Sequence, residues 1–325
     1  MDKSWTNKNT PIVYKSRRKT TMTIAAIAAL SLSIQLASVA AARSPSATAS
    51  MQSAAAISGT ASTKTVNAFE AYLSKDQLPA AIAYLKAHIG EVTTSQATVM
   101  VLHLENALKK RLPVIQKRFE QSAVQSGIGK AYKRGATFDD VISRTKDSNL
   151  KALLKETRDS GYKLETAEGF YYPVIDYAAF RTYSVSVNPD IDDYIAIMAT
   201  ESDQPKVKDA ALVIGYQQLV NRALAQERFL AKYAYSNRAP HIRNLFRSYE
   251  LLTFYGVNNT PLFEYGSQKI QPNALRGYNG MLAWNNAKLS PYLTKLQEFM
   301  DLVADNENRL TEEVEKFRQS HYPIR

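Results

Sequence analysis

The sequence contains no cysteine in its 325 residues and only four histidines. Without cysteine the chain can form no disulfide, no thiolate metal site and no thiol nucleophile. The histidines lie far apart, and none has the spacing of a metal-binding pair: His88, His103, His241 and His321. We therefore expect neither a metal ion nor a cofactor.

Motifs of several common enzyme classes are also absent. The chain has no G-x-S-x-G elbow of the hydrolase type and no G-x-x-x-x-G-K phosphate loop. A calcium-loop frame that starts at Asp190 has Ile195 where the turn requires glycine. No nucleic-acid-binding motif occurs, so the sequence predicts no nucleic-acid partner.

The N-terminal segment has the three parts of an export signal. A basic run from Lys15 to Lys19 precedes the apolar stretch Met22 to Leu36, and small residues follow up to Ala42. This order predicts a cleaved secretory signal peptide over residues 1–42 and an extracytoplasmic, cell-envelope-associated bacterial protein. An uncleaved N-terminal membrane anchor is the alternative, because the apolar segment and its flanks could span a bilayer.

The rest of the chain reads as a linker followed by a helical domain. Residues 43–63 are mostly Ala, Ser and Thr, which predicts a disordered linker. Helical periodicity then predicts a single all-α domain over 64–325, with a possible subdivision near residue 161. We expect an irregular multi-helix bundle with one long C-terminal helix, because apolar residues recur every three or four positions from Leu293 to Phe317.

One segment, residues 162–187, differs from the helical pattern. It is rich in Tyr, Phe and Val, which predicts a short β-hairpin or an irregular aromatic segment. Aromatic rings beside hydrogen-bonding side chains could form a sugar- or peptide-binding groove, or the rings could simply fill the core. The candidate binding residues here are Tyr171, Tyr172, Asp176 and Arg181.

The charge of the chain is uneven. Six basic residues and one acidic residue precede residue 41, so nearly half of the net charge of +11 belongs to the export signal. Further along, Lys110, Arg111, Lys117 and Arg118 recur at helical spacing and form a basic edge. Outside the cytoplasm, such an edge suits an anionic cell-envelope polymer or lipid headgroups.

Two alternatives stay open, one for the basic edge and one for the C-terminal helix. The acidic segment 298–315 could pack beside the basic edge and neutralise it. The apolar stripe of the C-terminal helix could bind another exported protein instead of the core. The sequence makes no prediction of the oligomeric state.

Three short segments resemble the lytic transglycosylases, which cleave cell-wall glycans. The run Ile195 to Pro205 contains the pair Glu201-Ser202, and the elements Gly215-Tyr216-Gln217-Gln218-Leu219 and Gly277-Tyr278-Asn279-Gly280 follow. The resemblance implies that Glu201 is the catalytic acid and that Tyr278 closes the site. A carboxyl in an apolar wall keeps its proton and can donate it to a glycosidic oxygen. The pattern of Val207 to Tyr233, however, predicts one continuous helix where that family has a loop.

Taken together, these features favour a secreted, cell-envelope-associated binding or interaction protein without catalytic activity. The alternative is a peptidoglycan-cleaving enzyme of the lytic-transglycosylase type that uses Glu201.

Overall fold

The computed structural model describes residues 45–324, with side chains from Gly59 onward. Residues 50–325 form one compact unit, and all the sites discussed below lie in it. The expected signal peptide or membrane anchor, residues 1–42, lies outside the described residues. Within the described part, no helix is both long enough and apolar enough to cross a membrane.

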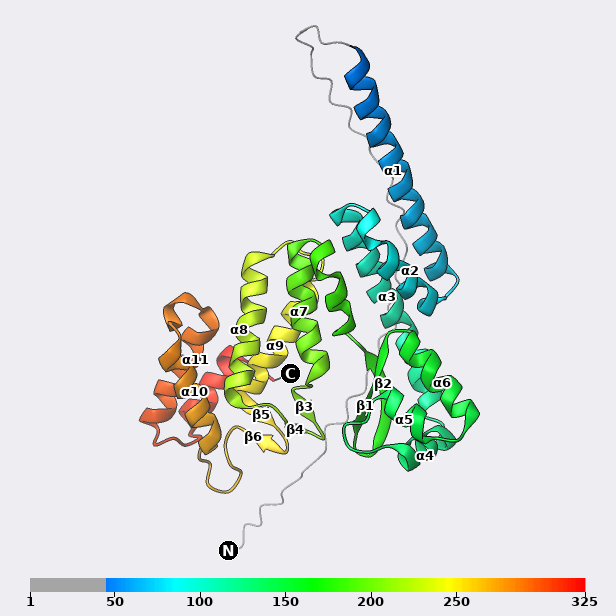
Figure 1. Cartoon of the computed structure of the whole chain (residues 1–325). Coiled ribbons are helices and arrows are strands. Elements are labelled where there is room, and N and C mark those ends of the chain that lie inside the picture. The colour runs from blue at the N-terminus through cyan, green and yellow to red at the C-terminus, as the bar shows by residue number, and fades with distance from the viewer. Residues whose placement is uncertain (1–44, 325) are drawn as a thin grey trace, which may run out of the picture. The chain divides into compact units, whose positions relative to one another are not determined.

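Helices make up most of the described chain, so the prediction of an all-α multi-helix fold is confirmed (Figure 1). The α-helices are α1 (Pro45–Ser74), α2 (Leu78–His88), α3 (Thr94–Phe119), α4 (Ser122–Ala131), α5 (Phe138–Arg144), α6 (Ser148–Asp159), α7 (Pro189–Asp203), α8 (Tyr216–Lys232), α9 (Ala239–Tyr255), α10 (Pro272–Trp284), α11 (Pro291–Asp305) and α12 (Glu312–His321). Three short 3₁₀ segments join them: η1 (Ile89–Glu91), η2 (Ala179–Ser186) and η3 (Ala287–Leu289).

Capping residues and prolines set many of the helix starts. Thr93 forms a capping box with Gln96 at the start of α3, and the Ser290 hydroxyl accepts a hydrogen bond from the Leu293 N–H at the start of α11. Proline stands in the first turn of α2, α7, α9, α10 and α11, where its missing N–H costs nothing. Pro113 does not split α3, which runs unbroken to Phe119.

The strands of the described part form three antiparallel hairpins. The longest pairs β1 (Tyr162–Ala167) with β2 (Phe170–Ile175), which confirms the hairpin expected in the aromatic segment. Two short hairpins pair β3 (Val207–Lys208) with β4 (Ala211–Leu212) and β5 (Gly256–Val257) with β6 (Thr260–Pro261).

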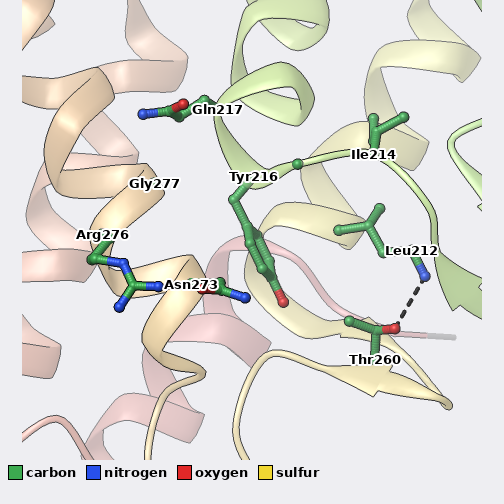
Figure 2. A pocket seen from close by; sticks show the side chains of 9 residues that line it. Leu212, Ile214, Tyr216, Gln217, Thr260, Asn273, Arg276 and Gly277 are labelled. Atoms are coloured by element: carbon green, nitrogen blue, oxygen red, sulfur yellow. Dashed lines mark hydrogen bonds between the residues drawn. The ribbon is translucent and has the colours of Figure 1, made fainter.

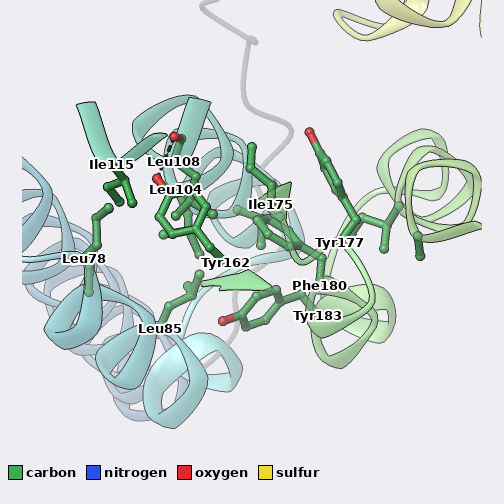
Figure 3. Packing of buried hydrophobic residues seen from close by; sticks show 14 of the residues in the cluster. Leu78, Leu85, Leu104, Leu108, Ile115, Tyr162, Ile175, Tyr177, Phe180 and Tyr183 are labelled. Atoms are coloured by element: carbon green, nitrogen blue, oxygen red, sulfur yellow. Dashed lines mark hydrogen bonds between the residues drawn. The ribbon is translucent and has the colours of Figure 1, made fainter. Parts of the chain in front are cut away.

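A first hydrophobic core gathers the side chains of α1 to α7, the β1–β2 hairpin and η2. The ring of Tyr162 lies among Leu85, Leu104 and Leu108 (Figure 3), and its hydroxyl donates a 2.8 Å hydrogen bond to the Leu108 carbonyl. Because the partner is a backbone carbonyl inside a helix, the phenol fixes β1 against α3 without leaving a buried polar atom unpaired.

One charged group, Glu105 of α3, is buried in this core with its side chain 2% exposed. Its carboxylate accepts hydrogen bonds from the hydroxyls of Tyr177 (2.6 Å) and Tyr194 (2.5 Å). Two cations complete the set: Lys109 Nζ lies 2.6 Å from it, as does Arg238 Nη2. We call these five residues the Glu105 cluster. It connects α3 to the residues just before η2, to α7 and to the segment before α9.

A second core gathers α8 to α12 and the short hairpins. Helices α8 and α9 serve both cores: Leu219 and Val220 pack in the second, whereas Phe229 and Ile242 pack in the first. Figure 1 shows α7, α8 and α9 side by side at this junction. The end of α7 therefore lies where the two cores meet, and the candidate site is built there.

The prediction of a single long C-terminal helix is wrong. The chain forms α11 and α12 with a break between them, where Glu307 and Asn308 adopt left-handed backbone angles (φ of 54° and 59°). The Ile270 N–H donates to the Asn308 carbonyl, and a β-bridge pairs Lys269 with Arg309, so the break is held by the segment before α10. Glu307 is the residue that interrupts the apolar stripe in the sequence.

The segment between residues 45 and 63 also differs from the expectation. Helix α1 begins at Pro45 and covers most of residues 43–63, for which a disordered linker was expected. Ser62 is buried, and its hydroxyl donates a 2.5 Å hydrogen bond to Gln96 Oε1. The expectation considered apolar burial alone, whereas small hydroxyl side chains can pack closely and hydrogen-bond to a neighbouring helix.

Candidate functional site

Glu201 lies in the last turn of α7, which ends there because Pro205 disfavours helical geometry at Gln204. The Ser202 hydroxyl donates to the Ile175 carbonyl (3.1 Å) and accepts a hydrogen bond from the Tyr177 N–H (3.3 Å). These two bonds fix the end of α7 against strand β2. The carboxylate of Glu201 is thereby held beside the aromatic hairpin.

Three side chains contact the Glu201 carboxylate, which is 13% exposed. The Tyr249 hydroxyl donates a 2.5 Å hydrogen bond to it, Lys206 Nζ lies 3.6 Å away and Arg222 Nη1 lies 3.7 Å away. Burial raises the pKa of Tyr249 far above its ordinary value, so this phenol keeps its proton and donates. Burial lowers the pKa of Lys206, although the charge of Glu201 acts in the opposite direction.

A cavity of about 380 Å³ opens beside Glu201. It lies between the β1–β2 hairpin, the end of α7 and one residue of α3, and we call it the Glu201 groove. Its walls combine apolar side chains, two tyrosines, a serine and two carboxylates: Leu112, Glu165, Tyr172, Val174, Ile175, Tyr177, Met198, Glu201, Ser202 and Pro205. The second carboxylate, Glu165, is paired with Lys208 Nζ at 2.5 Å.

The charges around Glu201 differ from those expected of a simple proton donor. The resemblance to lytic transglycosylases implies a carboxyl in an apolar wall, whereas Lys206 and Arg222 both lie within 4 Å of this one. The surroundings of Glu201 therefore depart from the apolar wall that the resemblance implies.

The segment after α7 is not the continuous helix that the sequence predicts from Val207 onward. The β3–β4 hairpin comes first, turning at Asp209 and Ala210 with left-handed backbone angles, and α8 begins only at Tyr216. The Ala210 carbonyl accepts a hydrogen bond from the Asn259 N–H of the β5–β6 hairpin. Periodicity failed here because this long-range pairing decides the local conformation.

The second and third transglycosylase-like segments pack against each other, although about 60 residues separate them. The rings of Tyr216 and Tyr278 meet edge to face with centroids 5.4 Å apart. A Cβ on Gly277 would lie 2.8 Å from the Tyr216 Cβ, so this approach requires glycine. Figure 2 shows Tyr216 and Gln217 facing α10 across a separate cavity that Arg276 and Asn273 also line.

Tyr278 itself is a core residue. It is 0% exposed, and its hydroxyl donates a 2.9 Å hydrogen bond to the Thr253 carbonyl. It lines neither this cavity nor the Glu201 groove. Of the two candidate catalytic residues, Glu201 alone reaches a cavity, and Tyr278 instead supports the packing of α10.

The candidate binding residues of the aromatic segment divide between groove and core. Tyr172 lines the Glu201 groove. Tyr171 points to the other side of the strand, as neighbours in a strand do, and its ring packs on that of Tyr132, directly after α4, with ring centroids 4.9 Å apart. Asp176 accepts a hydrogen bond from the Ala178 N–H, and the exposed Arg181 lies 3.6 Å from Asp203.

The other aromatic residues mostly fill the core. Tyr162, Tyr177, Phe180 and Tyr183 are each at most 6% exposed and belong to the first core (Figure 3). Most rings of this segment therefore fill the core, whereas Tyr172 and Tyr177 line the Glu201 groove.

The basic edge is partly paired. Arg111 forms an ion pair with Asp76 (2.8 Å) and Arg118 with Glu156 (2.6 Å), whereas Lys110 and Lys117 are exposed. The acidic segment 298–315 does not neutralise the edge, because α11 and α12 pack on the second core while α3 packs on the first. Three further exposed cations lie on α4 and the loop after it: Lys130, Lys133 and Arg134.

Sequence reasoning missed two residues of the site. Arg222 lies on α8 and Tyr249 on α9, and both are buried. Arg222 holds the end of α7 by donating to the Gln204 carbonyl at 2.7 Å. An arginine at a buried position of a helix indicates a polar partner inside the fold, and this was the signal available in the sequence.

Comparison with known proteins assigns no family, since no family model, no curated protein and no solved structure matches the chain. Within the part of the chain that the structure describes, no three His, Asp or Glu side chains gather into a group that could hold a metal ion.

Proposed function

We propose that the protein is exported and binds a sugar polymer of the cell envelope in the Glu201 groove. The observation that carries this proposal is one cavity in which the ring of Tyr172 and apolar side chains stand beside the carboxylates of Glu201 and Glu165. A sugar ring has an apolar face that packs on aromatic rings and hydroxyl groups that donate to carboxylates. The export part of the proposal rests on the signal-like residues 1–42.

The exposed cations support retention at the envelope. Positive charge is presented to solvent by Lys110 and Lys117 of α3, by Lys130 of α4, and by Lys133 and Arg134 in the loop after α4. Envelope polymers and lipid headgroups are commonly anionic, and attraction to them is weakened by salt. The cations would raise the local concentration of the polymer near the groove without selecting its sugar units.

A second candidate function is cleavage of the bound polymer with Glu201 as the proton-transferring group. It is favoured by the joint packing of Gly215-Tyr216-Gln217 on Gly277-Tyr278, together with the hairpin that replaces the expected helix after α7. Both features bring the chain closer to the lytic-transglycosylase pattern. Lys206 and Arg222 count against it, because the resemblance implies a catalytic acid in an apolar wall, whereas these two cations lie within 4 Å of the Glu201 carboxylate.

Binding is tested with the purified protein, insoluble cell walls and soluble oligomers of N-acetylglucosamine. We expect Tyr172→Ala to weaken oligomer binding at least about tenfold, since stacking and burial of one aromatic ring are lost. Phe170→Ala is the matched control, because Phe170 lies on the same strand, is 56% exposed and lies outside the groove. No binding by the wild type, or equal loss in both variants, would contradict the proposal.

Cleavage is tested in the same mixtures by chromatography of the soluble fraction. If the second candidate holds, the wild type releases soluble fragments and Glu201→Gln reduces their rate by roughly 10²- to 10⁴-fold, as expected for loss of a general acid or base. Oligomers that bind but stay intact would leave the protein as a binding protein alone.

A further inference from the structure

A cavity of about 420 Å³ lies beside the second core and shares no lining residue with the Glu201 groove. It lies between the start of α8, the start of α10 and the two short hairpins β3–β4 and β5–β6. Its polar side chains are Gln217, Thr260, Asn273 and Arg276. We call it the Arg276 cavity.

The Arg276 cavity is electropositive and open to a ligand. Arg276 is the one charged side chain among the described residues that line it, and none of them is acidic. Arg276, Asn273 and Gln217 are exposed and Thr260 is half-buried, so a ligand can reach all four side chains. A cavity lined by charge of one sign attracts the opposite charge, which here favours an anion.

Internal hydrogen bonds orient two of these side chains as donors. Asn273 Oδ1 accepts a 2.5 Å hydrogen bond from Arg276 Nη2, which leaves the Asn273 Nδ2 group to donate. Thr260 Oγ1 accepts a 3.1 Å hydrogen bond from the Leu212 N–H, which leaves its own proton to donate. Arg276 has five N–H groups and no acceptor. The cavity therefore offers mainly donors, which suit a group with several acceptor oxygens.

Two glycines of α10 admit the fourth polar side chain. The close approach at Gly277 brings the start of α8 onto α10. One turn further along α10, a Cβ on Gly280 would lie 3.3 Å from Gln217 Nε2, so the Gln217 amide occupies the space that a larger residue would fill. Figure 2 shows Arg276 and Asn273 on α10, with Gln217 and Thr260 on other elements around the cavity. The possible donors therefore come from α8, α10 and β6.

Donors on three elements favour a phosphate over a carboxylate. A phosphate presents three acceptor oxygens in different directions, whereas a carboxylate presents two in one plane. A guanidinium can pair with two of the phosphate oxygens at once and leave the third to the other donors.

The cavity is also larger than a bare ion requires, because its volume is that of a site for a small organic molecule. The rest of its wall is formed by Leu212, Ile214 and the ring of Tyr216, whose hydroxyl is buried out of reach of a ligand. This wall can cover the carbon skeleton of a sugar or a polyol. A phosphate that fills the cavity is therefore one that a larger group carries.

We propose that the Arg276 cavity binds a phosphate group carried on a sugar or polyol. Arg276 pairs with two phosphate oxygens, and the other polar side chains donate to the third. This site goes beyond the proposed function, since the oligomers that test the Glu201 groove are uncharged.

The ligand class is tested with glycerol 3-phosphate, inorganic phosphate and glycerate, by titration calorimetry on the full chain. We expect glycerol 3-phosphate to bind at least about tenfold more tightly than glycerate, which carries a carboxylate on a similar skeleton. It should also bind more tightly than inorganic phosphate, which cannot use the apolar wall. Glycerate that binds as tightly would overturn the assignment to phosphate, and inorganic phosphate that binds as tightly would overturn the assignment to a carried group.

The residue is tested with Arg276→Gln, which should lower the affinity for glycerol 3-phosphate at least about tenfold, because a charged pair of hydrogen bonds is lost. Arg243→Gln is the matched control: Arg243 is an exposed arginine of α9 that does not line the cavity. This control should bind as the wild type does. Unchanged affinity in Arg276→Gln, or the same loss in both variants, would overturn the inference.

A second variant and the melting temperature separate ligand binding from support of the fold. Arg276→Lys keeps the charge but not the planar fork, so its affinity should fall between those of the wild type and Arg276→Gln. The melting temperatures of both variants should match the wild type, because Arg276 is exposed. Lost affinity accompanied by a clearly lower melting temperature in both would assign Arg276 to the fold and overturn its role. Binding of N-acetylglucosamine oligomers should be unchanged in Arg276→Gln, so this inference and the proposed function fail separately.

Discussion

Replacement of Glu105 by glutamine tests whether the Glu105 cluster holds the first core together. The carboxylate accepts hydrogen bonds from Tyr177 and Tyr194 and lies 2.6 Å from Lys109 Nζ and from Arg238 Nη2. Glutamine keeps the shape of the side chain but removes its charge and turns one acceptor oxygen into a donor nitrogen. At least one of the four donors then faces another donor.

The expected loss follows from the burial of the partners. Removing one member of a buried ion pair typically costs about 3–5 kcal/mol, because the other charge is left buried and uncompensated. Arg238 is 13% exposed and has this problem, whereas Lys109 is 36% exposed and can turn toward water. We therefore expect Glu105→Gln to lower the free energy of unfolding by about 3 kcal/mol, which in a chain of this size lowers the melting temperature by roughly 5 °C.

The loss should depend on pH in a defined direction. Burial acts to raise the pKa of Glu105, but the hydrogen bonds and charge of Lys109 and the two tyrosine hydroxyls outweigh it, so the pKa lies below the ordinary value of 4.5. A carboxyl with a lowered native pKa stabilises the fold above its unfolded pKa, and this contribution disappears as the pH falls through the native pKa. The difference between wild type and Glu105→Gln should therefore shrink below about pH 4.5.

The assay is urea denaturation followed by circular dichroism at pH 7 and near pH 4. Glu156→Gln is the control, since Glu156 also pairs with an arginine but is 47% exposed. We expect the control to lose about 1 kcal/mol or less, as surface ion pairs do. A loss below 1 kcal/mol in Glu105→Gln, or a loss that is the same at both pH values, would refute this account of the cluster.

Three further substitutions, one of them with a matched control, are tested by thermal or urea denaturation. Gly277→Ala places a Cβ 2.8 Å from the Tyr216 Cβ and should cost about 1–3 kcal/mol, whereas Gly266→Ala, with nothing within 4 Å, should be tolerated. Glu307→Gly relieves a left-handed residue (φ 54°) and should gain about 1 kcal/mol; a loss would contradict the strain. Burial lowers the pKa of Lys206 below its ordinary value of 10.5, so between the native pKa and 10.5 the unfolded state binds more protons than the folded state. The free energy of unfolding should therefore rise with pH in this range, and Lys206→Met should lack the rise.

Local signals in the sequence were sufficient for most of the helices. Helix α10 (Pro272–Trp284) is an example, because proline at its start and an apolar stripe are both local features of the sequence. The break in the C-terminal helix was not predictable in the same way. It depends on backbone pairing of Ile270 with Asn308 and of Lys269 with Arg309, about 40 residues apart, which no local pattern records.

The residues of the candidate site also divide into those that a local sequence signal reveals and those that only the fold brings together. The pair Glu201-Ser202 could be found from the sequence, since the pair and the proline that ends its helix lie within five residues of each other. The partners of Glu201 could not, because Tyr249 and Arg222 come from two other helices. Their sequence positions look like ordinary helix positions until the fold brings them to one carboxylate.

The partners of Glu201 decide its chemistry more than the residue type does. A glutamate in a short motif suggests a proton donor in an apolar wall, but the Glu201 carboxylate accepts a hydrogen bond from Tyr249 and lies within 4 Å of Lys206 and Arg222. Arg222 also donates a 2.7 Å hydrogen bond to the Gln204 carbonyl, so one guanidinium both holds the end of α7 and lies beside the carboxylate. The side chains that α8 and α9 bring to Glu201 therefore decide what a ligand in the Glu201 groove meets there.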